Sequence, residues 1–450
     1  MTIWTNCITE LLMDKAIARA RYLDSLPEPR GAVFGLPIST KEHHGMVGDG
    51  VATNASYACW VGKSHGSNLL YDTLWDEGCV FFARTTQPQT IMHLETNSNI
   101  FGRTVNPFNR GLAAGGSSDG EAALIGMRGS LVGIGSDIGG SIRCPAAHVG
   151  IYGFKPTTKR ISSRSEAPYA LVAQPWRVDP DLTVKGWEPY EIQKPLKIAV
   201  QWWDGVVQPH PPITRALRSR RRMPESRSEG RGLGQWPKEL ISHHEGWDII
   251  SSLYFPDGGE EVLGLLRQTG EPILPLTKLI IQEQPTVKNL TQQELWSKID
   301  SLSRQLCSKR DQYRAKYARA WTTSGAEDGQ EVDVILCPAS FGAATPHDQS
   351  RYWGYTANWN LLDYPGAVFP VTTVDPVKDR VDTTYVPKNN QDKWAHEMYD
   401  PAKYTNAPVS LQVIGRRQCD EKVLAALGDI ERAWKGLARR LAVKKKPEFI

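Results

Sequence analysis

One stretch rich in glycine and serine, residues 115–143, constrains this chain more than any other feature. It begins Gly-Gly-Ser-Ser-Asp-Gly-Glu and ends Asp-Ile-Gly-Gly-Ser-Ile-Arg. Glycine permits positive φ and close approach of a ligand, so the consecutive N–H groups of residues 137–141 can point into one concavity. Such a concavity suits a developing oxyanion, and the hydroxyl of Ser141 lies beside it, where a nucleophile is needed.

A serine nucleophile needs a base, because its proton must leave as the oxygen attacks. Lys41 is the upstream candidate, at the end of the segment Gly-Leu-Pro-Ile-Ser-Thr-Lys, which we expect to be a strand. A lysine acts as a base only when it is neutral, which requires burial or positive neighbours that lower its pKa. The pattern therefore predicts a buried Lys41 beside the glycine-rich turns.

Taken together, these motifs resemble the amidase signature family, the Ser–cisSer–Lys amidohydrolases. The flanking segments Lys-Glu-His-His-Gly-Met, from Lys41, and Met-His-Leu-Glu-Thr, from Met92, are most similar to its fungal acetamidase-like branch. The resemblance implies that Lys41 is the base, Ser117 the bridging serine at a cis peptide, and Ser141 the nucleophile that becomes acylated. It also implies four oxyanion donors, the backbone N–H groups of Ile138, Gly139, Gly140 and Ser141.

Five further residues are assigned to this site. Asp137 and Arg143 are expected to form an ion pair that holds the oxyanion turn, and Ser136 to hydrogen-bond the proton relay. Ser118, next to the bridging serine, is assigned a supporting role. In the resembling family the apolar loop that begins at Ile91 lines the acyl side of the cleft, so Ile91 is assigned to substrate binding.

Asp119 departs from the family pattern Gly-Gly-Ser-Ser-Gly-Gly. A carboxylate close to Lys41 favours the ammonium form, and each unit by which it raises the lysine pKa costs about 1.4 kcal/mol, or tenfold in active base. Family members also carry a longer segment after Thr157 and additional N-terminal helices. These departures support a second hypothesis, a catalytically impaired or inactive amidase-like protein. A third is the ammonia-donating subunit of an amidotransferase.

Two other clusters could carry chemistry. Cys144 and His148 suggest a thiol–imidazole pair, but Pro145 lies between them and no orienting carboxylate is evident. His43 and His44 could bind a metal, but adjacent residues point in different directions and no acidic or thiol ligands complete a set. We therefore predict neither a metal nor an organic cofactor.

The order of elements predicts an α/β protein with a central mixed β-sheet flanked by helices on both faces. We expect a single domain over residues 1–435, with atypical segments at 158–173 and 218–246, and a basic tail at 436–450. Strands are expected near residues 35–41, 79–83, 197–200, 333–338, 366–369 and 409–414. Helices are expected near residues 12–23, 68–77, 120–127 and 421–433, with a long one that starts at a Thr291–Glu294 capping box.

Composition limits the partners. The net charge of +4 is small for 450 residues, so nucleic acid is not an expected partner, and the basic run at 218–234 is more typical of a solvated loop than of a nucleic-acid-binding patch. The N-terminus lacks the pattern of a signal peptide, and no apolar run is long enough to predict a membrane span. Seven dispersed cysteines favour a reducing, cytoplasmic location. The expected partner is a small-molecule amide. A homodimer is also considered.

Overall fold

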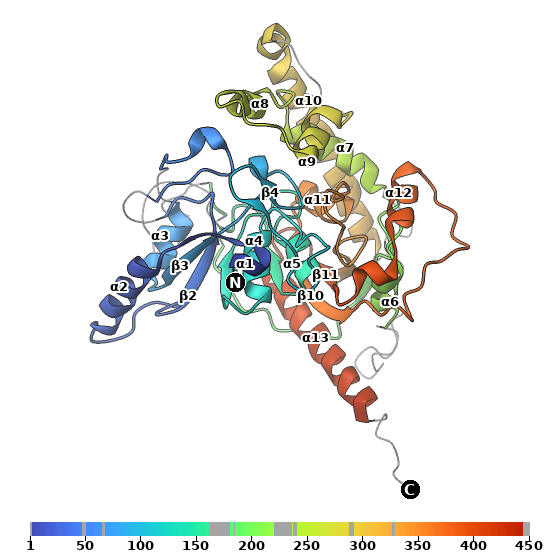
Figure 1. Ribbon diagram of the computed structural model, residues 1–450. Coiled ribbons are helices and arrows are strands. Elements are labelled where there is room, and N and C mark those ends of the chain that lie inside the picture. Colours follow the sequence, from blue (N-terminus) through green and yellow to red (C-terminus); the bar gives the residue numbers. More distant parts are fainter. Residues whose placement is uncertain are drawn as a thin grey trace.

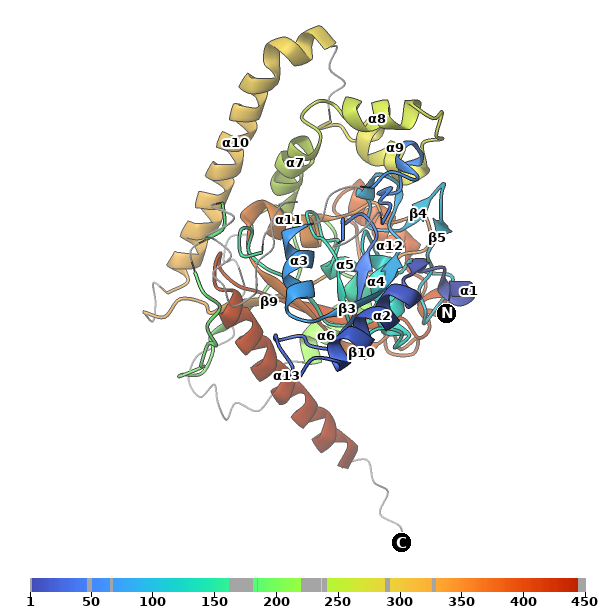
Figure 2. The same ribbon diagram turned by 90° about the vertical axis from the view of Figure 1, so that its left-hand side faces the viewer.

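The computed structural model describes residues 2–46, 51–64, 68–161, 181–183, 185–219, 236, 241–287, 292–325 and 329–443. It is a mixed α/β structure in which two long helices extend from a layered body (Figures 1 and 2). The expected α/β class with mixed strands is confirmed. Within the described ranges, no helix combines the length and apolar character needed to cross a bilayer.

The N-terminal part of the chain forms a four-stranded mixed sheet, on the left of Figure 1. Its strands are β1 (Ile8–Leu11), β2 (Pro37–Lys41), β3 (Val80–Thr85) and β6 (Val132–Ile134), in the order β1-β3-β2-β6. β2 pairs in parallel with β3 and β6, whereas β1 pairs antiparallel with β3. Because β2 lies between two partners, Lys41 at its end is carried into the interior.

The predicted order of helix, glycine and strand is seen at α3 (Leu69–Asp76). The Asn68 side chain caps the helix by accepting the Leu70 N–H at 3.0 Å, as the residue type favours. After the helix, Gly78 adopts φ +88°, and a β-carbon there would lie 3.0 Å from the backbone of Phe34. Glycine therefore allows the chain to reverse tightly into β3.

A second, five-stranded mixed sheet follows later in the chain, in the order β7-β10-β11-β9-β8. Its strands are β7 (Gly153–Lys155), β8 (Ile198–Val200), β9 (Val334–Pro338), β10 (Gly366–Thr373) and β11 (Pro408–Ile414). All neighbouring strands are antiparallel except β8 and β9. The hydrogen bonds among the described residues thus divide the expected central sheet into two parts, separated between β6 and β7.

Strand β9 explains why helices cover both faces of the second sheet. Its side chains alternate between faces, so Val334 and Leu336 join one apolar cluster while Ile335 and Cys337 join another. The first cluster includes residues of α6 (Pro211–Ser219) and α13 (Asp420–Val443). The second includes residues of α7 (His243–Tyr254), α10 (Gln292–Thr323) and α11 (Gly354–Leu362).

The remaining elements connect these layers. Short helices and turns complete the body: α1 (Thr2–Thr5), η1 (Ala58–Trp60), η2 (Gln89–Ile91), α5 (Arg143–Val149), α8 (Glu260–Arg267), α9 (Pro275–Lys278), the π-helical turn η6 (Leu279–Glu283), α12 (Asn390–Met398) and η7 (Pro401–Tyr404). Two helices near the N-terminal sheet are α2 (Met13–Asp24) and α4 (Asp119–Gly126), close to their expected positions. A two-stranded ribbon is formed by β4 (Asn97–Ser98) and β5 (Gly102–Arg103).

The C-terminal helix is longer than expected. Prediction ended it near residue 433, but α13 continues to Val443, so the first part of the expected basic tail is helical. The small residues beyond residue 433 do not interrupt the apolar spacing strongly enough to end a helix. Residues 444–450 lie outside the described residues, as does the expected capping box at Thr291.

The atypical segments are described only in part. After β7, the side chain of Asp420 accepts the N–H of Thr157 at 2.7 Å, and that of Asp363 accepts the N–H of Thr158 at 2.8 Å. The chain that leaves the first half is therefore attached to the C-terminal elements. Residues 162–180 and 220–235 are outside the described residues, so the predictions made for those stretches are not addressed.

We expect the Leu336→Ala variant to be about 2–5 kcal/mol less stable than the wild type, because it removes a fully buried side chain from the cluster between the sheet and α13. Urea denaturation followed by tryptophan fluorescence measures the change. Val377→Ala, at a side chain that is 71% exposed, serves as the control and should change stability by less than about 0.5 kcal/mol. Equal losses in the two variants would contradict the assigned core.

Candidate active site

Lys41 is the buried centre of the site. Its side chain is fully enclosed, and Nζ donates to Ser117 Oγ at 2.6 Å and to Ser136 Oγ at 3.1 Å. The lysine comes from the end of β2, and the two serines come from the turns before α4 and after β6. Two of the expected contacts, those of Lys41 with Ser117 and with Ser136, are therefore present in the structure.

Burial lowers the pKa of Lys41 to about 7, since an ammonium group loses its hydration in this position. The negative charges of Asp119, Asp137 and Glu121 act in the opposite direction and raise the lysine pKa. The expected effect of Asp119 is thus present, but it is smaller than the effect of burial. A substantial fraction of Lys41 is neutral near pH 7 as a result.

The turn that carries Ser117 is packed tightly against other backbone. The peptide bond between Gly116 and Ser117 is cis, as the family resemblance implied. A β-carbon on Gly116 would lie 2.3 Å from the backbone nitrogen of Glu95, and one on Gly115, where φ is +93°, would lie 2.4 Å from the Cα of Pro145. Only glycine fits at these positions, which explains the glycine pair in the motif.

Ser141 lies on the loop between β6 and α5, beside the Ser117 turn. The N–H of Ser118 donates to the carbonyl oxygen of Ser141 at 3.1 Å. Ser118 Oγ donates to the carbonyl oxygen of Ser136 and accepts the N–H of Ser136, each at 3.3 Å. These bonds hold the two turns together. Within the described residues, the hydroxyls of Ser117 and Ser141 are not hydrogen-bonded to each other, and that part of the expected relay is not closed.

Three of the four expected oxyanion donors have free N–H groups. The N–H of Gly140 donates to Asp137 Oδ1 at 2.9 Å, so it is committed within the loop. Among the described residues, the N–H groups of Ile138, Gly139 and Ser141 have no hydrogen-bond acceptor. In this structure three of the four groups are thus free to bind a ligand, and the role of all four as oxyanion donors stays a prediction.

A buried ion pair stabilises the loop, as expected. Arg143 Nε donates to Asp137 Oδ2 and Nη2 to Oδ1, each at 3.0 Å, and both side chains are fully buried. Asn360 adds bonds of 2.9 Å to the carboxylate and to the backbone carbonyl of Asp137. Burial alone would raise the pKa of Asp137, but the Arg143 guanidinium holds that pKa well below its usual range.

Asp119 points toward the loop before β4. Its Oδ2 accepts the N–H of Thr96 at 3.0 Å, and Oδ1 accepts the Thr96 hydroxyl. Burial raises the pKa of Asp119 to about 7, although the Thr96 donors lower it. Asp119 is the first residue of α4 and does not adopt positive φ, so no left-handed conformation has to be tolerated there. It is Gly120 that requires glycine, because a β-carbon would meet Thr86 N at 2.4 Å.

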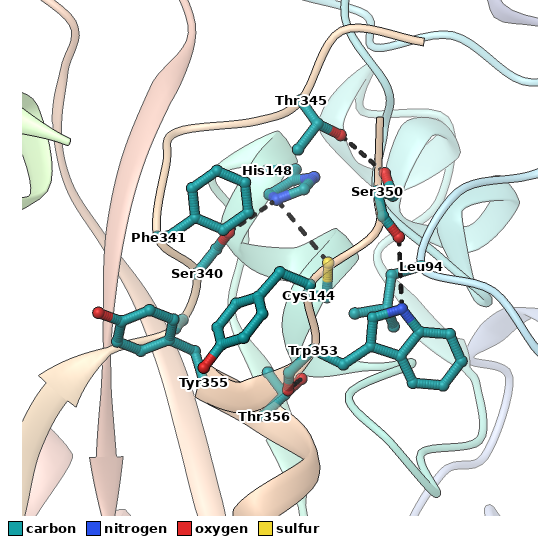
Figure 3. A pocket seen from close by; sticks show the side chains of 12 residues that line it. Leu94, Cys144, His148, Ser340, Phe341, Thr345, Ser350, Trp353, Tyr355 and Thr356 are labelled. Carbon is teal, nitrogen blue, oxygen red and sulfur yellow. Dashed lines mark hydrogen bonds between the residues drawn. The ribbon is translucent and has the colours of Figure 1, made fainter. Parts of the chain in front are cut away.

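Cys144 and His148 do come together, contrary to the expectation based on Pro145. They lie on α5 with Sγ and Nε2 3.7 Å apart, since proline is tolerated in the first turn of a helix. They line a cavity of about 10 Å³, roughly the size of one water, beside Trp353 and Thr356 (Figure 3). Burial raises the thiol pKa and lowers the pKa of His148 to about 4, so both groups are neutral and unsuited to nucleophilic catalysis.

Ile91 and the histidine pair His43 and His44 lie in packed surroundings. Ile91 packs in an apolar cluster with Leu266 and Tyr57, and its role in substrate binding stays a prediction. The rings of His43 and His44 are tilted by 39° with their centroids 3.8 Å apart, and burial lowers the pKa of both. Within the described part of the chain, no set of three His, Cys, Asp or Glu side chains is arranged to hold a metal ion.

Sequence reasoning missed the residues that hold the loop from outside. Thr356 Oγ1 donates to the Gly139 carbonyl at 2.7 Å, and a β-carbon on Gly140 would lie 2.2 Å from that hydroxyl. Asn360 is one helical turn away on the same face of α11. These residues are more than two hundred positions from the loop, and no local pattern indicates that they contact it.

Replacement of Arg143 by methionine should lower the free energy of unfolding by about 3–5 kcal/mol at neutral pH, because Asp137 is left buried and unpaired. The stabilising contribution of a carboxylate with a lowered pKa is present above the pKa it has when unfolded and is lost as pH falls. The difference between variant and wild type should therefore shrink in acid. Denaturation at several pH values tests this, with exposed Arg267→Met as control; a loss independent of pH would contradict the assignment.

Comparison with known proteins agrees with this geometry. The family model described as "Amidase" matches residues 3–175 and 173–424. An acetamidase of Aspergillus oryzae is 35% identical over 93% of this chain and 82% of its own length, and an acetamidase of Emericella nidulans is 34% identical over 95% and 82%.

Solved structures lead to the same conclusion. A structure titled fatty acid amide hydrolase superposes with a TM-score of 0.84 at 31% identity, covering 96% of this chain and 79% of that one. The sequence motifs, the buried lysine with its two serines and the extent of these matches converge. This chain belongs to the amidase family, the amidase signature enzymes, and has their fold.

Proposed function

We propose that this amidase hydrolyses a carboxylic acid amide to the acid and ammonia or an amine, with Ser141 as nucleophile and Ser117 and Lys41 as its proton relay. Amide hydrolysis itself follows from membership of the family. The assignment of roles rests on one observation, a fully buried lysine with Nζ 2.6 Å from the hydroxyl of Ser117.

The reaction begins when Ser141 Oγ adds to the amide carbonyl carbon. Its proton passes to Ser117 Oγ as the Ser117 proton moves to the neutral amine of Lys41. The carbonyl oxygen, now negative, accepts hydrogen bonds from the free N–H groups in the loop. Substrate binding is expected to bring the Ser141 and Ser117 hydroxyls into contact, because catalytic hydrogen bonds are often completed only in the complex.

The second half of the reaction returns the protons. The C–N bond breaks as the relay delivers a proton to the leaving nitrogen, which departs as ammonia or an amine. Water then adds to the acyl carbon while the relay accepts a proton from the water. The bond to Ser141 Oγ breaks as the relay returns that proton to Ser141 Oγ, and the carboxylic acid is released. The steps that the relay performs are thus pure proton transfers.

The acyl group of the substrate is proposed to be small. The fungal relatives that cover most of this chain are named acetamidases, which supports a short aliphatic amide such as acetamide as the first substrate to test. The structure titled fatty acid amide hydrolase has the same fold, so an amide with a longer acyl chain is the second substrate to test.

The alternative of an inactive protein is not favoured. It rested on the shorter N-terminus, the shorter segment after Thr157 and Asp119. For Asp119, burial keeps the Lys41 pKa near 7 and the carboxylate is held by Thr96. A cytoplasmic location and a homodimer remain our proposals. The free cysteines found in the described structure support the former.

Ser141→Ala should abolish labelling by a fluorophosphonate probe and lower acetamide hydrolysis by at least about a thousandfold, because the variant lacks the nucleophile. Lys41→Met should lower both by a similar factor while leaving Ser141 in place. Intact-protein mass spectrometry detects the adduct, and a coupled ammonia assay gives the rate. Retained labelling in Ser141→Ala would show that another residue is the nucleophile.

Asp119→Asn should extend activity to lower pH. While ionised, the carboxylate raises the Lys41 pKa, so its removal moves the acid limb down and increases the neutral amine near pH 7, by up to about tenfold for each unit of change. Well below pH 7 the effect fades, because burial raises the pKa of Asp119 to about 7 and the carboxyl is then already protonated. The amide still accepts the Thr96 N–H. The pH profile of kcat/KM measures the shift, and Asp204→Asn, at a buried carboxylate that does not act on Lys41, is the matched control. An unchanged acid limb in Asp119→Asn would contradict the electrostatic role.

A further inference from the structure

We propose that the hydroxyl of Tyr254 positions the oxyanion-binding N–H of Gly139 by holding the carbonyl group of the same peptide unit. Tyr254 is the last residue of α7, which packs against α11 (Figure 1), and α11 in turn contacts the oxyanion loop through Thr356 and Asn360. Its hydroxyl donates to the carbonyl oxygen of Ile138 at 2.5 Å. The inference rests on the proposed role of Ser141 and of the loop that precedes it.

The argument follows from the shape of a peptide unit. In a trans peptide the C=O and N–H bonds of one unit lie in one plane and point in opposite directions. The unit that joins Ile138 and Gly139 is not among the cis bonds of the described chain. When Tyr254 fixes the direction of the Ile138 carbonyl, it therefore also fixes the Gly139 N–H, which points away from the tyrosine and has no acceptor among the described residues.

The neighbouring units are held in the same way. The carbonyls of Asp137, Gly139 and Gly140 accept hydrogen bonds at 2.9, 2.7 and 2.7 Å. Their donors are Asn360 Nδ2, Thr356 Oγ1 and the N–H of Cys144. The loop thus has donors on every carbonyl, and the free N–H groups of Ile138 and Ser141 are set by the same rule as that of Gly139. Each free N–H is preorganised without contacting a protein acceptor.

Tyr254 differs from the other three donors because its hydroxyl has one hydrogen bond in the described structure, the bond to Ile138. Asn360 also binds the Asp137–Arg143 pair, Thr356 also contacts Trp353, and the Cys144 N–H belongs to the start of a helix. Removal of the tyrosine hydroxyl therefore changes one contact only, which makes the role testable.

The tyrosine is held in place and remains protonated. A β-carbon on Gly139 would lie 2.8 Å from the Tyr254 hydroxyl and 3.2 Å from the ring of Trp353, so these two side chains cover the glycine. The Tyr254 and Trp353 rings are 6.3 Å apart between centroids. Burial raises the tyrosine pKa further above its ordinary value, and the charge of Asp137 adds to this effect. The hydroxyl is thus a donor throughout the range in which Lys41 titrates.

The test is Tyr254→Phe in the full chain, with acetamide as substrate and an alkyl trifluoromethyl ketone as probe of the oxyanion site. Ser141 Oγ adds to the ketone carbon, its proton passes to the relay, and the C=O bond becomes a C–O⁻ group that the loop must bind. We expect kcat to fall about tenfold to a hundredfold, less than the loss on deletion of a true oxyanion donor. KM should stay within about twofold, and affinity for the ketone should fall by the same factor as kcat.

Tyr399→Phe is the matched control, because its hydroxyl also donates to a single backbone carbonyl, that of Asp379 at 2.7 Å, in the cluster beside α6. It should leave kcat, KM and ketone affinity unchanged. Wild-type kinetics in Tyr254→Phe would overturn the proposal. So would a fall in kcat without a parallel fall in ketone affinity, which indicates a structural effect.

Gly139→Ala provides a second test of the same contact: alone, if Tyr254→Phe is poorly folded, it should lower kcat and ketone affinity together, and where both variants fold they form a double-mutant cycle. The added methyl group meets the Tyr254 hydroxyl, so Gly139→Ala should reduce kcat more in the wild-type background than in Tyr254→Phe. Additive effects would contradict the coupling. Ser141→Ala separates the two levels: if it keeps full activity, the proposed nucleophile is wrong, whereas an inactive Ser141→Ala with normal Tyr254→Phe overturns only the inference.

Discussion

The enclosure of Lys41 is the constraint on which the rest of this structure depends. An exposed lysine is protonated at neutral pH and cannot accept a proton, so the proposed base depends on β2, which carries this side chain into a position closed to solvent. The cost of desolvating the amine is met by packing around it, including the two hydroxyls that contact Nζ. Three carboxylates lie close enough to raise the lysine pKa, and the balance between them and burial sets the pH at which the base is neutral.

Two sheets and one helix cooperate to build the site. Lys41 comes from the four-stranded sheet, and the loop with Ser141 connects that sheet to α5, which packs against β10 and β11 of the second sheet. Helix α11, between β9 and β10 in the chain, contributes Thr356 and Asn360 to the same loop. The groups proposed to react and the groups that orient their loop thus come from different parts of the chain. The first set belongs to the N-terminal third, and most of the second set belongs to the C-terminal half.

This division explains what the sequence could predict. The motifs around Lys41, Ser117 and Ser141 are short, and each residue in them has a local physical role. Gly116, for example, must approach another backbone closely, so the candidate chemistry could be predicted from the motifs themselves. The mixed α/β class was also predictable from apolar spacing. Contacts between distant segments were not: nothing local shows that Asn360 reaches Asp137 or that Asp119 turns to Thr96. Nor did spacing show that the strands separate into two hydrogen-bonded sheets.

The distance along the chain between reacting and orienting groups has a consequence for biosynthesis. A nascent chain that has emerged only as far as Thr157 already contains the lysine and both serines, but it lacks α7 and α11, and with them the donors that set the loop carbonyls. Since domains fold largely as units, the hydrolytic machinery cannot be assembled until most of the polypeptide has left the ribosome. Truncated products of premature termination would accordingly be catalytically inactive and unable to hydrolyse amides in the cell that makes them.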